Sequence, residues 1–327
     1  MIDPLILVQQ VAVLLLIMIP GFLLAKFHLV GDGFGKSIAN VILYAAQPAL
    51  IIMGFVSVDF NTDVIIRMLM VFVLALIAHA LFYLLGLLTY KNAPEKRKNV
   101  LLFATVFTNA GYMGVPLLEA LFAREFPEIS IYGSVYITAF NIFCWSLGCY
   151  IYTKDKKYIS VRKIVFNPAT ISTIIGVILF AFSAVASVRE AVIVPFFREE
   201  GVVRSFIINM KNLVAPLSML LIGFRFASVK LRGAFKDKYL YIGLFVSLFA
   251  VPFVTFLLTK LVSLVGIYTD VLATSILLVS AAAPAATATG MFAEKFDGDA
   301  PYASLVVSLT SLLCVISMPI VSMLTLL

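Results

Sequence analysis

Long apolar stretches, separated by short groups of charged residues, follow one another along the whole chain. Nine windows without Asp, Glu, Lys or Arg are each about 20 residues or longer: 4–25, 37–58, 68–90, 99–118, 129–153, 164–188, 239–259, 271–293 and 300–327. A tenth stretch, 204–226, is interrupted only by Lys211 and Arg225. Because a helix rises 1.5 Å per residue, about 20 residues cross a hydrocarbon core of ~30 Å. The pattern predicts an all-α polytopic membrane protein with ten transmembrane helices.

Composition agrees with this class and narrows the chemistry. Hydrophobic residues make up 62% of the chain and charged residues 13%, which is outside the range of soluble domains. The three cysteines (Cys144, Cys149 and Cys314) fall inside apolar windows, where we expect them to pack as small hydrophobic residues. With only two histidines, the chain predicts no metal site and no cofactor. The first window lacks a basic segment before it, so we expect a spanning helix and no cleavable signal.

The basic residues lie mainly in alternate loops, which explains the net charge of +7 without a nucleic-acid partner. Groups such as Lys96-Arg97-Lys98 and Lys154–Lys163 fill the third and fifth loops. By the positive-inside rule the odd-numbered loops are cytoplasmic, so both termini are expected outside the inner (plasma) membrane. The ninth loop, around Glu294–Asp299, is locally acidic and departs from this pattern. The sixth connection, roughly 189–203, is expected to lie on the surface or re-enter the membrane.

Two of the apolar windows contain glycine and proline residues in their interior, where they destabilise a continuous spanning helix. Asn109-Ala-Gly-Tyr-Met-Gly-Val-Pro116 interrupts one window, and Ala281–Gly290, with Pro284, interrupts another. Glycine loosens a helix, and proline removes an amide donor and clashes with the carbonyl four residues earlier. Freed backbone groups cannot face lipid, so such breaks must be buried in protein or line a cavity. Paired breaks in corresponding helices indicate the binding site of a secondary transporter.

An internal repeat relates the two breaks. Pro48 and Pro116 are 68 residues apart, as are Pro216 and Pro284, so one offset of 168 residues relates both pairs. Five spans per copy is an odd number, so the second copy enters the membrane from the opposite side. The sequence therefore predicts two inverted five-helix repeats, 1–158 and 159–327, with broken helices 4 and 9.

The breaks also predict the class of ligand. The second half-helices are expected to begin near the prolines and to direct two partially positive N-termini at the midplane. No Asp or Glu lies near the middle of any span, so a bound anion or neutral polar ligand is favoured over a cation. The candidate substrate-binding residues flank the two breaks: Asn109, Gly111, Tyr112, Gly114, Pro116, Ala283, Pro284, Thr287 and Thr289. Asn109 is expected to donate to a carboxylate, to cap its own broken helix, or both.

Other polar residues in the spans are weaker candidates for a functional role. His79 lies deep in the third span, where an ionisable residue is a candidate for proton coupling or a neutral partner of a neighbouring helix. Gln47 and Glu119 are candidate supports of the site. Gln47 is better explained by helix packing than by ligand contact, and Glu119 by a salt link or by reaching outward. Lys211 is expected to extend its ammonium group toward the membrane surface.

These residues resemble the auxin efflux carrier family, the bacterial relatives of plant PIN transporters. Asn109–Pro116, followed by two leucines, is similar to the family's Asn…Met-Gly-x-Pro-Leu-Leu motif in its first crossover helix. Pro284, with Phe292-Ala293 and Phe296 downstream, resembles the second crossover segment more weakly, since the second proline of plant members is absent here. The likeness covers essentially the whole chain.

The resemblance implies a fold and a mechanism. Spans 1, 2, 6 and 7 would form a scaffold that mediates homodimerisation, and spans 3–5 and 8–10 would form a transport domain. Spans 4 and 9 would cross at their prolines, and the cycle would be of the elevator type. Asn109 would bind the carboxylate of the substrate.

The sequence favours a transporter of small organic anions over three alternatives. Substrates would be auxin-like monocarboxylates or dicarboxylates such as malate or malonate. A sodium- or proton-coupled transporter of the bile-acid or cation-antiporter type would need carboxylates or a dense polar cluster beside the breaks. A receptor would normally carry a soluble output domain. An intramembrane enzyme would need a nucleophile–base pair or a metal-ligand set in the spans.

Overall fold

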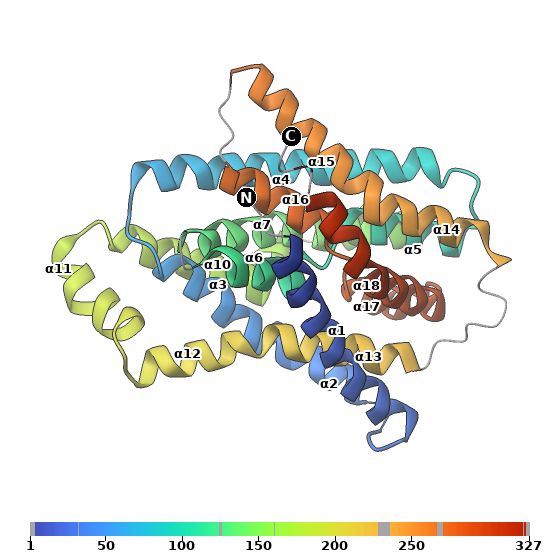
Figure 1. Ribbon diagram of the computed structural model, residues 1–327, viewed down its shortest axis with the longest axis horizontal. Helices are drawn as coiled ribbons and strands as arrows, with labels where there is room; N and C mark the ends of the chain where they lie inside the picture. The colour runs from blue at the N-terminus through green and yellow to red at the C-terminus, as the bar shows by residue number, and fades with distance from the viewer. Residues whose placement is uncertain are drawn as a thin grey trace.

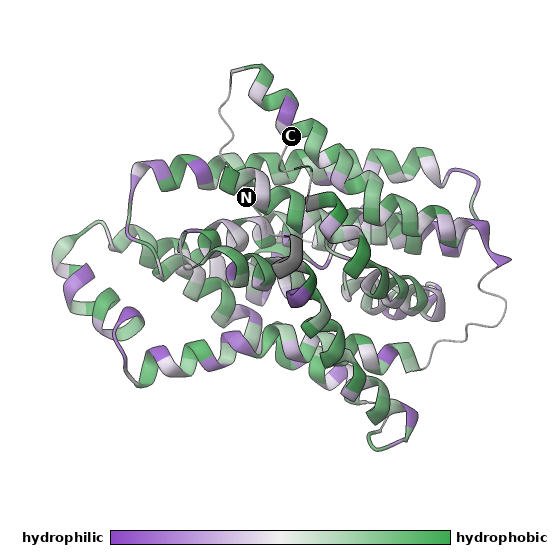
Figure 2. Ribbon diagram, viewed as in Figure 1, coloured by the Kyte–Doolittle hydropathy of each residue, from purple (hydrophilic) through white to green (hydrophobic). Residues whose placement is uncertain are grey.

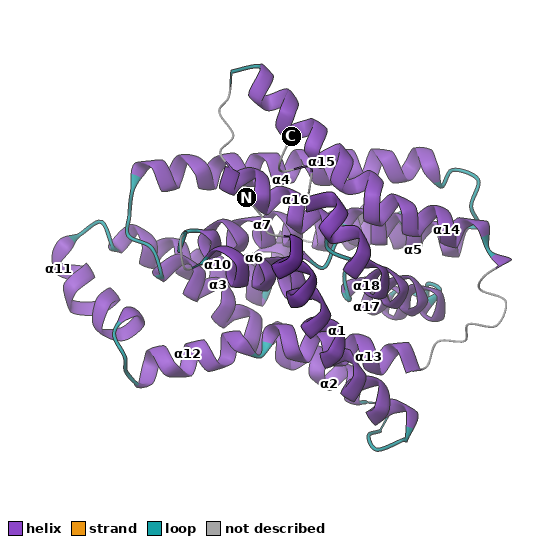
Figure 3. Cartoon of the chain, viewed as in Figure 1, coloured by secondary structure: helices purple, strands orange, loops and turns teal. Residues whose placement is uncertain are grey.

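Helices account for nearly the whole described chain (Figure 3). The computed structural model describes residues 4–31, 33–123, 126–159, 161–227, 236–266, 271–322 and 324. Lys230 and Arg232, which contribute to the positive charge of the predicted seventh loop, lie outside the described residues. Figure 1 shows the long helix α4 and the consecutive helices α12 and α13 at opposite edges of a bundle, with the remaining helices between them.

Several helices are divided by short π-helical turns, labelled η together with the 3₁₀ turns. The elements of the first half are α1 (Pro4–Lys26), α2 (Phe34–Val41), η1 (Ile42–Ala46), α3 (Gln47–Val56), α4 (Thr62–Thr89), α5 (Glu95–Val106), η2 (Ala110–Gly114), α6 (Val115–Phe122), α7 (Ile129–Phe143), η3 (Cys144–Gly148), α8 (Cys149–Thr153) and η4 (Lys156–Tyr158). Those of the second half are α9 (Val161–Val165), α10 (Pro168–Phe182), α11 (Ala186–Val188), η5 (Arg189–Arg198), α12 (Val202–Asn212), α13 (Val214–Ala227), α14 (Lys238–Phe245), η7 (Val246–Ala250), α15 (Val251–Leu264), α16 (Val271–Ala282), α17 (Ala288–Lys295) and α18 (Ala300–Ser322).

The prediction of a polytopic helical membrane protein is confirmed. Among the described residues, seven helices are long and apolar enough to cross a membrane, and an eighth span is formed if α10 is joined to the bent helix after it. The remaining two predicted spans, 99–118 and 271–293, are each divided into shorter helices, as their glycines and prolines predict. Their pieces are treated below as the candidate site.

Three of the π-helical turns have a common cause in the sequence. The turns η1, η2 and η7 each end two residues before a proline: Pro48, Pro116 and Pro252. A proline ring clashes with the carbonyl four residues earlier, which in each case belongs to the middle residue of the turn. Widening that turn relieves the clash while the helix continues. Each of these prolines therefore lies in a helix that continues through it, directly after a widened turn.

Hydrophobic residues run along most helices (Figure 2), and many of their large side chains are exposed on the outside of the bundle. On α4 one face is buried, including Val71, Ala78 and Phe82, while the opposite face exposes large hydrophobic side chains. The exposed positions recur at helical spacing: Ile66, Leu69, Val73, Ile77, Leu84 and Leu88. A helix that is hydrophobic all round is typical of a membrane span, because its outer face contacts lipid.

Two long helix pairs pack closely within the bundle. Helix α1 packs along α13, and α10 packs along α3. In the first pair a Cβ on Gly21 would overlap the backbone of Leu220, and one on Gly223 would overlap the backbone of Met18. In the second pair Gly176 lies against the Phe55 ring. Small residues at such contacts let two membrane helices approach closely.

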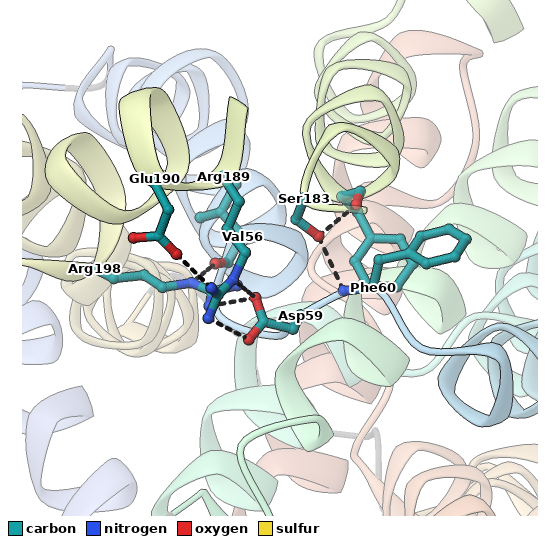
Figure 4. Close-up of polar contacts among 8 residues, drawn as sticks. Val56, Asp59, Phe60, Ser183, Arg189, Glu190 and Arg198 are labelled. Atoms are coloured by element: carbon teal, nitrogen blue, oxygen red, sulfur yellow. Dashed lines mark hydrogen bonds and ion pairs between the residues drawn. The ribbon is translucent and has the colours of Figure 1, made fainter. Parts of the chain in front are cut away.

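The predicted surface or re-entrant segment 189–203 begins with a helix that folds back. The helix Ala186–Arg198 is bent by 114° from α10. Its two arginines hold the loop between α3 and α4 (Figure 4): Arg189 Nε and Arg198 Nη1 donate to Asp59 Oδ1 at 2.8 and 2.7 Å. Arg198 Nε also donates to the Val56 carbonyl at 2.9 Å. The hydrogen bond from Arg189 lowers the pKa of Asp59 below its ordinary value of 3.8.

Candidate functional site

The two breaks predicted from the sequence lie against each other in the middle of the bundle. Helix α5 ends at Val106 and the next helix starts at Ala110, while α16 ends at Ala282 and α17 starts at Ala288. Between these helices the two interrupted segments pair in antiparallel fashion at Thr108 and Ala285. The backbone N–H of Asn109 donates to the Pro284 carbonyl at 2.6 Å, and the backbone N–H of Ala286 donates to the Phe107 carbonyl at 2.8 Å.

Side chains complete this junction. Thr108 Oγ1 donates to the Ser280 carbonyl at 2.7 Å, and the Ala285 amide donates to Thr310 Oγ1 of α18 at 3.1 Å. All of these groups are buried. The junction thus supplies partners for backbone groups that the two breaks release, which is what an irregular backbone at membrane depth requires.

The breaks occupy slightly different positions from those expected. The first interruption lies at 107–109, one turn before the glycines, and the second half-helix begins at Ala110 with the π-helical turn η2. Pro116 lies in the first turn of α6, within that same half-helix. Pro284 lies inside the extended segment, and α17 starts four residues after it. The second half-helices therefore begin within six residues of their prolines, before Pro116 in the first segment and after Pro284 in the second.

A cavity opens beside the junction. Its volume is about 130 Å³, close to the ~150 Å³ of a protein cavity that holds one benzene molecule. Five predicted residues line it: Gln47, Asn109, Gly111, Tyr112 and Thr287. The turns η1, η2 and η3 contribute to its wall, as do the N-terminal residues of the helix Ala110–Phe122 and of α17. Two positive helix ends therefore meet at this cavity.

The amide of Asn109 is the most unusual group of the cavity. Its side chain is only 2% exposed, and Nδ2 has no hydrogen-bond partner among the described residues. Leaving a buried donor unpaired costs about 1–3 kcal/mol, so such a group indicates a function. Its neighbours are better satisfied: the Tyr112 hydroxyl donates to Gln47 Oε1 at 3.2 Å.

The other predicted site residues do not line the cavity. Gly114 packs against Ser280 of α16, and Ala283, Pro284 and Thr289 are buried. Pro116 is half-buried within α6. These residues shape the backbone of the two broken segments.

Two cations of the span 202–227 hold the second half-helices. Lys211 Nζ lies 2.9 Å from Glu119 Oε1, which also accepts from Ser130 Oγ at 2.6 Å. Arg225 Nη1 donates to the Thr287 carbonyl at 3.2 Å, and its Nη2 lies 3.9 Å from Glu294. Lys211 therefore pairs inside the bundle with Glu119, and the expectation that it reaches toward the membrane surface is wrong.

His79 lies one layer behind the first break. The ring is fully buried, and Nδ1 is 2.7 Å from the carbonyl of Ala75 in its own helix. Aromatic rings surround it, among them Phe107, Phe140 and Phe143. Among the described residues no carboxylate contacts the ring. Nε2 also lacks a described partner.

Several cavity residues were not assigned to the site from the sequence. One face of α7 and η3 supplies Ile137, Phe140, Asn141, Cys144 and Trp145, and one face of α17 supplies Ala288, Met291, Phe292 and Lys295. Both sets recur at the helical spacing of three and four residues. For the α17 set, counting this spacing from Thr287 could have found its members in the sequence. Across the described chain, no three His, Cys, Asp or Glu side chains gather closely enough to hold a metal ion.

Comparison with known proteins gives two matches. The family described as membrane transport protein matches residues 6–162 and 156–322. A protein of Methanocaldococcus jannaschii named uncharacterized transporter MJ1031 is 23% identical over 307 residues, which cover 88% of this chain and 89% of that protein.

Proposed function

The chain belongs to the membrane transport protein family, and from that premise we propose that it is a secondary transporter of small organic anions. The family match also agrees with the resemblance to auxin efflux carriers that the Asn109–Pro116 motif carries. Transport would proceed by alternating access, with the substrate held beside the two broken helices.

The observation that carries the proposal is the unpartnered amide of Asn109 in a cavity between two helix N-termini. An amide donor and two positive helix ends favour a carboxylate at this point. No Asp or Glu is among the described residues that line the cavity. A bound cation would therefore find no carboxylate ligand there, whereas a bound anion would find donors already in position.

The cavity lining limits the substrate further. Most of the wall is apolar, including Ile137, Phe140 and Phe292, and the polar residues Thr108, Asn109 and Thr287 line it at the junction. A volume of about 130 Å³ admits one small organic molecule. We therefore favour a monocarboxylate with a small apolar body over a dicarboxylate such as malate or malonate.

The proposal includes ten spans in two inverted repeats. Offsets of 164, 168 and 176 residues between their first residues relate α1 to α10, the span 34–56 to 202–227, and the broken segment 95–122 to 271–295. Two helix pairs support it: α1 packs on α13, and their counterparts α10 and α3 also pack together. Such reciprocal pairing is the arrangement that two inverted copies of one unit would produce.

In this scheme the spans 1, 2, 6 and 7 form a scaffold and the others an elevator-type transport domain. Lys211–Glu119 and Arg225–Thr287 then join the two parts, so these contacts would change during the cycle. The basic loops would be cytoplasmic and both termini external. A homodimer would assemble through the scaffold.

A sodium- or proton-coupled transporter on the same fold is the alternative. His79 is its candidate proton carrier, because it is buried directly behind the first break. Without a described acidic partner beside the ring, a proton relay through His79 lacks a second member, which favours the simpler anion transporter.

The test is ligand-dependent thermal stability of the purified protein. Benzoate, indole-3-acetate, malonate and malate would each be added with and without sodium, at two pH values. A ligand at a hundredfold excess over its dissociation constant should add about 2.7 kcal/mol to the stability of the folded protein. We expect this stabilisation with a carboxylate, and we expect Asn109→Ala to lose it.

Asn99→Ala is the matched control. Asn99 is buried in the same broken segment but accepts a hydrogen bond from Lys154 at 3.0 Å and does not line the cavity. This variant should keep the stabilisation by the carboxylate. Stabilisation by sodium alone, unaffected by Asn109→Ala, would instead support the cation-coupled alternative and reject anion binding at the first break.

A further inference from the structure

A second cavity lies beside the central one and shares part of its wall. Its volume is about 620 Å³, and it is lined by residues of η1, α3 and the start of α10, among others. Three residues line both cavities: Leu43, Trp145 and Lys295. They therefore stand where a molecule would pass from the wide side cavity to the narrow central cavity.

Lys295 is the only charged side chain among the described residues that line either cavity. Its Nζ lies 5.0 Å from the centre of the Trp145 ring and 5.6 Å from that of Phe296. A cation over an aromatic face is stabilised there, so the ammonium group is kept at the passage.

The acidic residues around Lys295 are engaged elsewhere. Glu294 pairs with Arg225 at 3.9 Å, and Asp297 pairs with Lys96 at 3.5 Å. Asp299 Oδ1 accepts from the Tyr302 amide at 3.1 Å. In the described part of the chain, no carboxylate lies within salt-bridge distance of Lys295 Nζ. Among the described residues, the positive charge at the passage is therefore not paired with a carboxylate.

We propose that Lys295, held over Trp145, is the residue that captures the substrate anion between the two cavities and selects it over neutral molecules. The carboxylate pairs first with the Lys295 ammonium group and then moves along α17 to the donors at the junction. The eight residues of α17 separate these two positions by about 10 Å. The statement that the captured anion is the substrate rests on the proposed function. The attraction of anions to Lys295 at the passage does not depend on it.

The first test uses the fluorescence of Trp145, which is the only tryptophan of the chain. Iodide, an anion, and acrylamide, a neutral molecule, quench tryptophan on collision and would be compared at constant ionic strength. A unit charge about 5 Å away enriches an anion roughly fourfold in water, and ~0.1 M salt reduces this to roughly two- to threefold. We expect Lys295→Gln to lower the iodide quenching constant by that factor and to leave acrylamide quenching unchanged.

Two further variants control this measurement. Lys295→Arg keeps the charge and should keep the iodide quenching. Lys238→Gln removes another exposed lysine that lies over an aromatic ring, 5.2 Å from the centre of Tyr239, but lines neither cavity. Lys238→Gln should leave the quenching constants of both iodide and acrylamide unchanged. Iodide quenching that stays constant in Lys295→Gln, or that falls equally in Lys238→Gln, would reject the capture role.

The second test measures uptake of radiolabelled benzoate into proteoliposomes. We expect Lys295→Gln to raise KM about two- to fivefold, with a smaller change in maximal rate, because the charge acts on capture. Lys295→Arg should restore KM. A wild-type protein that takes up no carboxylate would count against the proposed function, while the quenching experiment would still decide whether Lys295 attracts anions to the passage. A KM unchanged in Lys295→Gln would reject its role in selecting the substrate.

Discussion

The first broken segment, 95–122, presents a buried side-chain amide to the cavity, whereas the second, 271–295, has no side-chain amide and presents the polar side chains of Thr287 and Lys295 there. Asn109 has no equivalent in the second segment, where the facing residue Thr287 has its carbonyl bound by Arg225. The two segments nevertheless meet through reciprocal backbone hydrogen bonds. The comparison teaches that similar broken backbones leave different groups available: the Asn109 side-chain amide of the first segment has no partner among the described residues, whereas the Thr287 carbonyl of the second is bound by a neighbouring span.

The prolines differ in the same way. Pro116 follows a widened helical turn and stays inside a helix, while Pro284 stands in the extended segment and offers its carbonyl to Asn109. The first proline therefore shapes a helix that carries Gly111 and Tyr112 to the cavity wall. The second proline contributes directly to the junction.

The largest effect should come from replacing the recognising amide with a like charge. We expect Asn109→Asp to weaken carboxylate binding more than a hundredfold, because like charges in contact cost several kcal/mol. Thr287→Val should weaken it only about fivefold, the value of one neutral hydrogen bond of ~1 kcal/mol. Titration calorimetry with benzoate measures both. Equal losses in the two variants would show that the two breaks share recognition.

The next effect concerns how the second segment is held. Arg225→Gln should lower the free energy of unfolding by about 1.5–3 kcal/mol, because a charged donor to the buried Thr287 carbonyl is lost. Gly290→Ala should act in the same direction, since a Cβ there would overlap Arg225 Nη1. Thermal unfolding in detergent measures both variants.

Gly114→Ala is the matched change in the first segment. The nearest atom to its Cβ would be Ser280 Cα at 3.4 Å, an ordinary contact, so stability should change by less than about 0.5 kcal/mol. If Gly114→Ala destabilises the protein as much as Gly290→Ala, the difference between the two segments does not hold.

A smaller effect is expected for the ion pair that holds the first segment. The side chains of Lys211 and Glu119 are 20% and 14% exposed. Their contribution to stability should therefore lie between that of a surface ion pair and that of a fully buried one. A double-mutant cycle with Lys211→Met and Glu119→Gln should give a coupling of about 1 kcal/mol in thermal unfolding. Lys211→Met should cost more than Glu119→Gln, because it leaves a carboxylate with only Ser130 as a described partner. A coupling near zero would mean that Lys211 does not hold α6.

The sequence predicted the class of the fold and the position of both breaks because these depend on local chemistry. Apolar windows of sufficient length define spans, and glycine and proline interrupt helices wherever they stand. It also selected Asn109 and Thr287, which flank those interruptions and line the cavity. The π-helical turns were missed, although Pro48, Pro116 and Pro252 signal them at a constant spacing.

Residues brought to the cavity by tertiary packing were harder to predict. Trp145 and Lys295 lie on helices that approach the junction only in the folded bundle, so the helical spacing in their own segments does not by itself assign them to the site. The partners Glu119 and Lys211 are 92 residues apart, so their pairing also required the fold. Local rules therefore locate the breaks, and the fold decides which side chains surround them.

The smallest effect is expected at the surface cluster of Figure 4, which serves as a comparison for the cations that hold the two breaks. Asp59 binds Arg189 and Arg198, and its pKa is lowered mainly by the hydrogen bond from Arg189. Its side chain is 47% exposed, so solvent screening limits the pair to less than about 1 kcal/mol. Because the folded state favours the carboxylate, this stabilisation is present above the ordinary pKa of 3.8 and is lost as the pH falls below it. Asp59→Asn should therefore melt slightly below wild type at pH 7, and the gap should narrow as the pH falls below 3.8 and through the lowered pKa of Asp59. A gap that persists at acid pH would show that Asp59 stabilises the loop through hydrogen bonding that does not need its charge, and the contrast with Arg225 would then be one of geometry and not of burial.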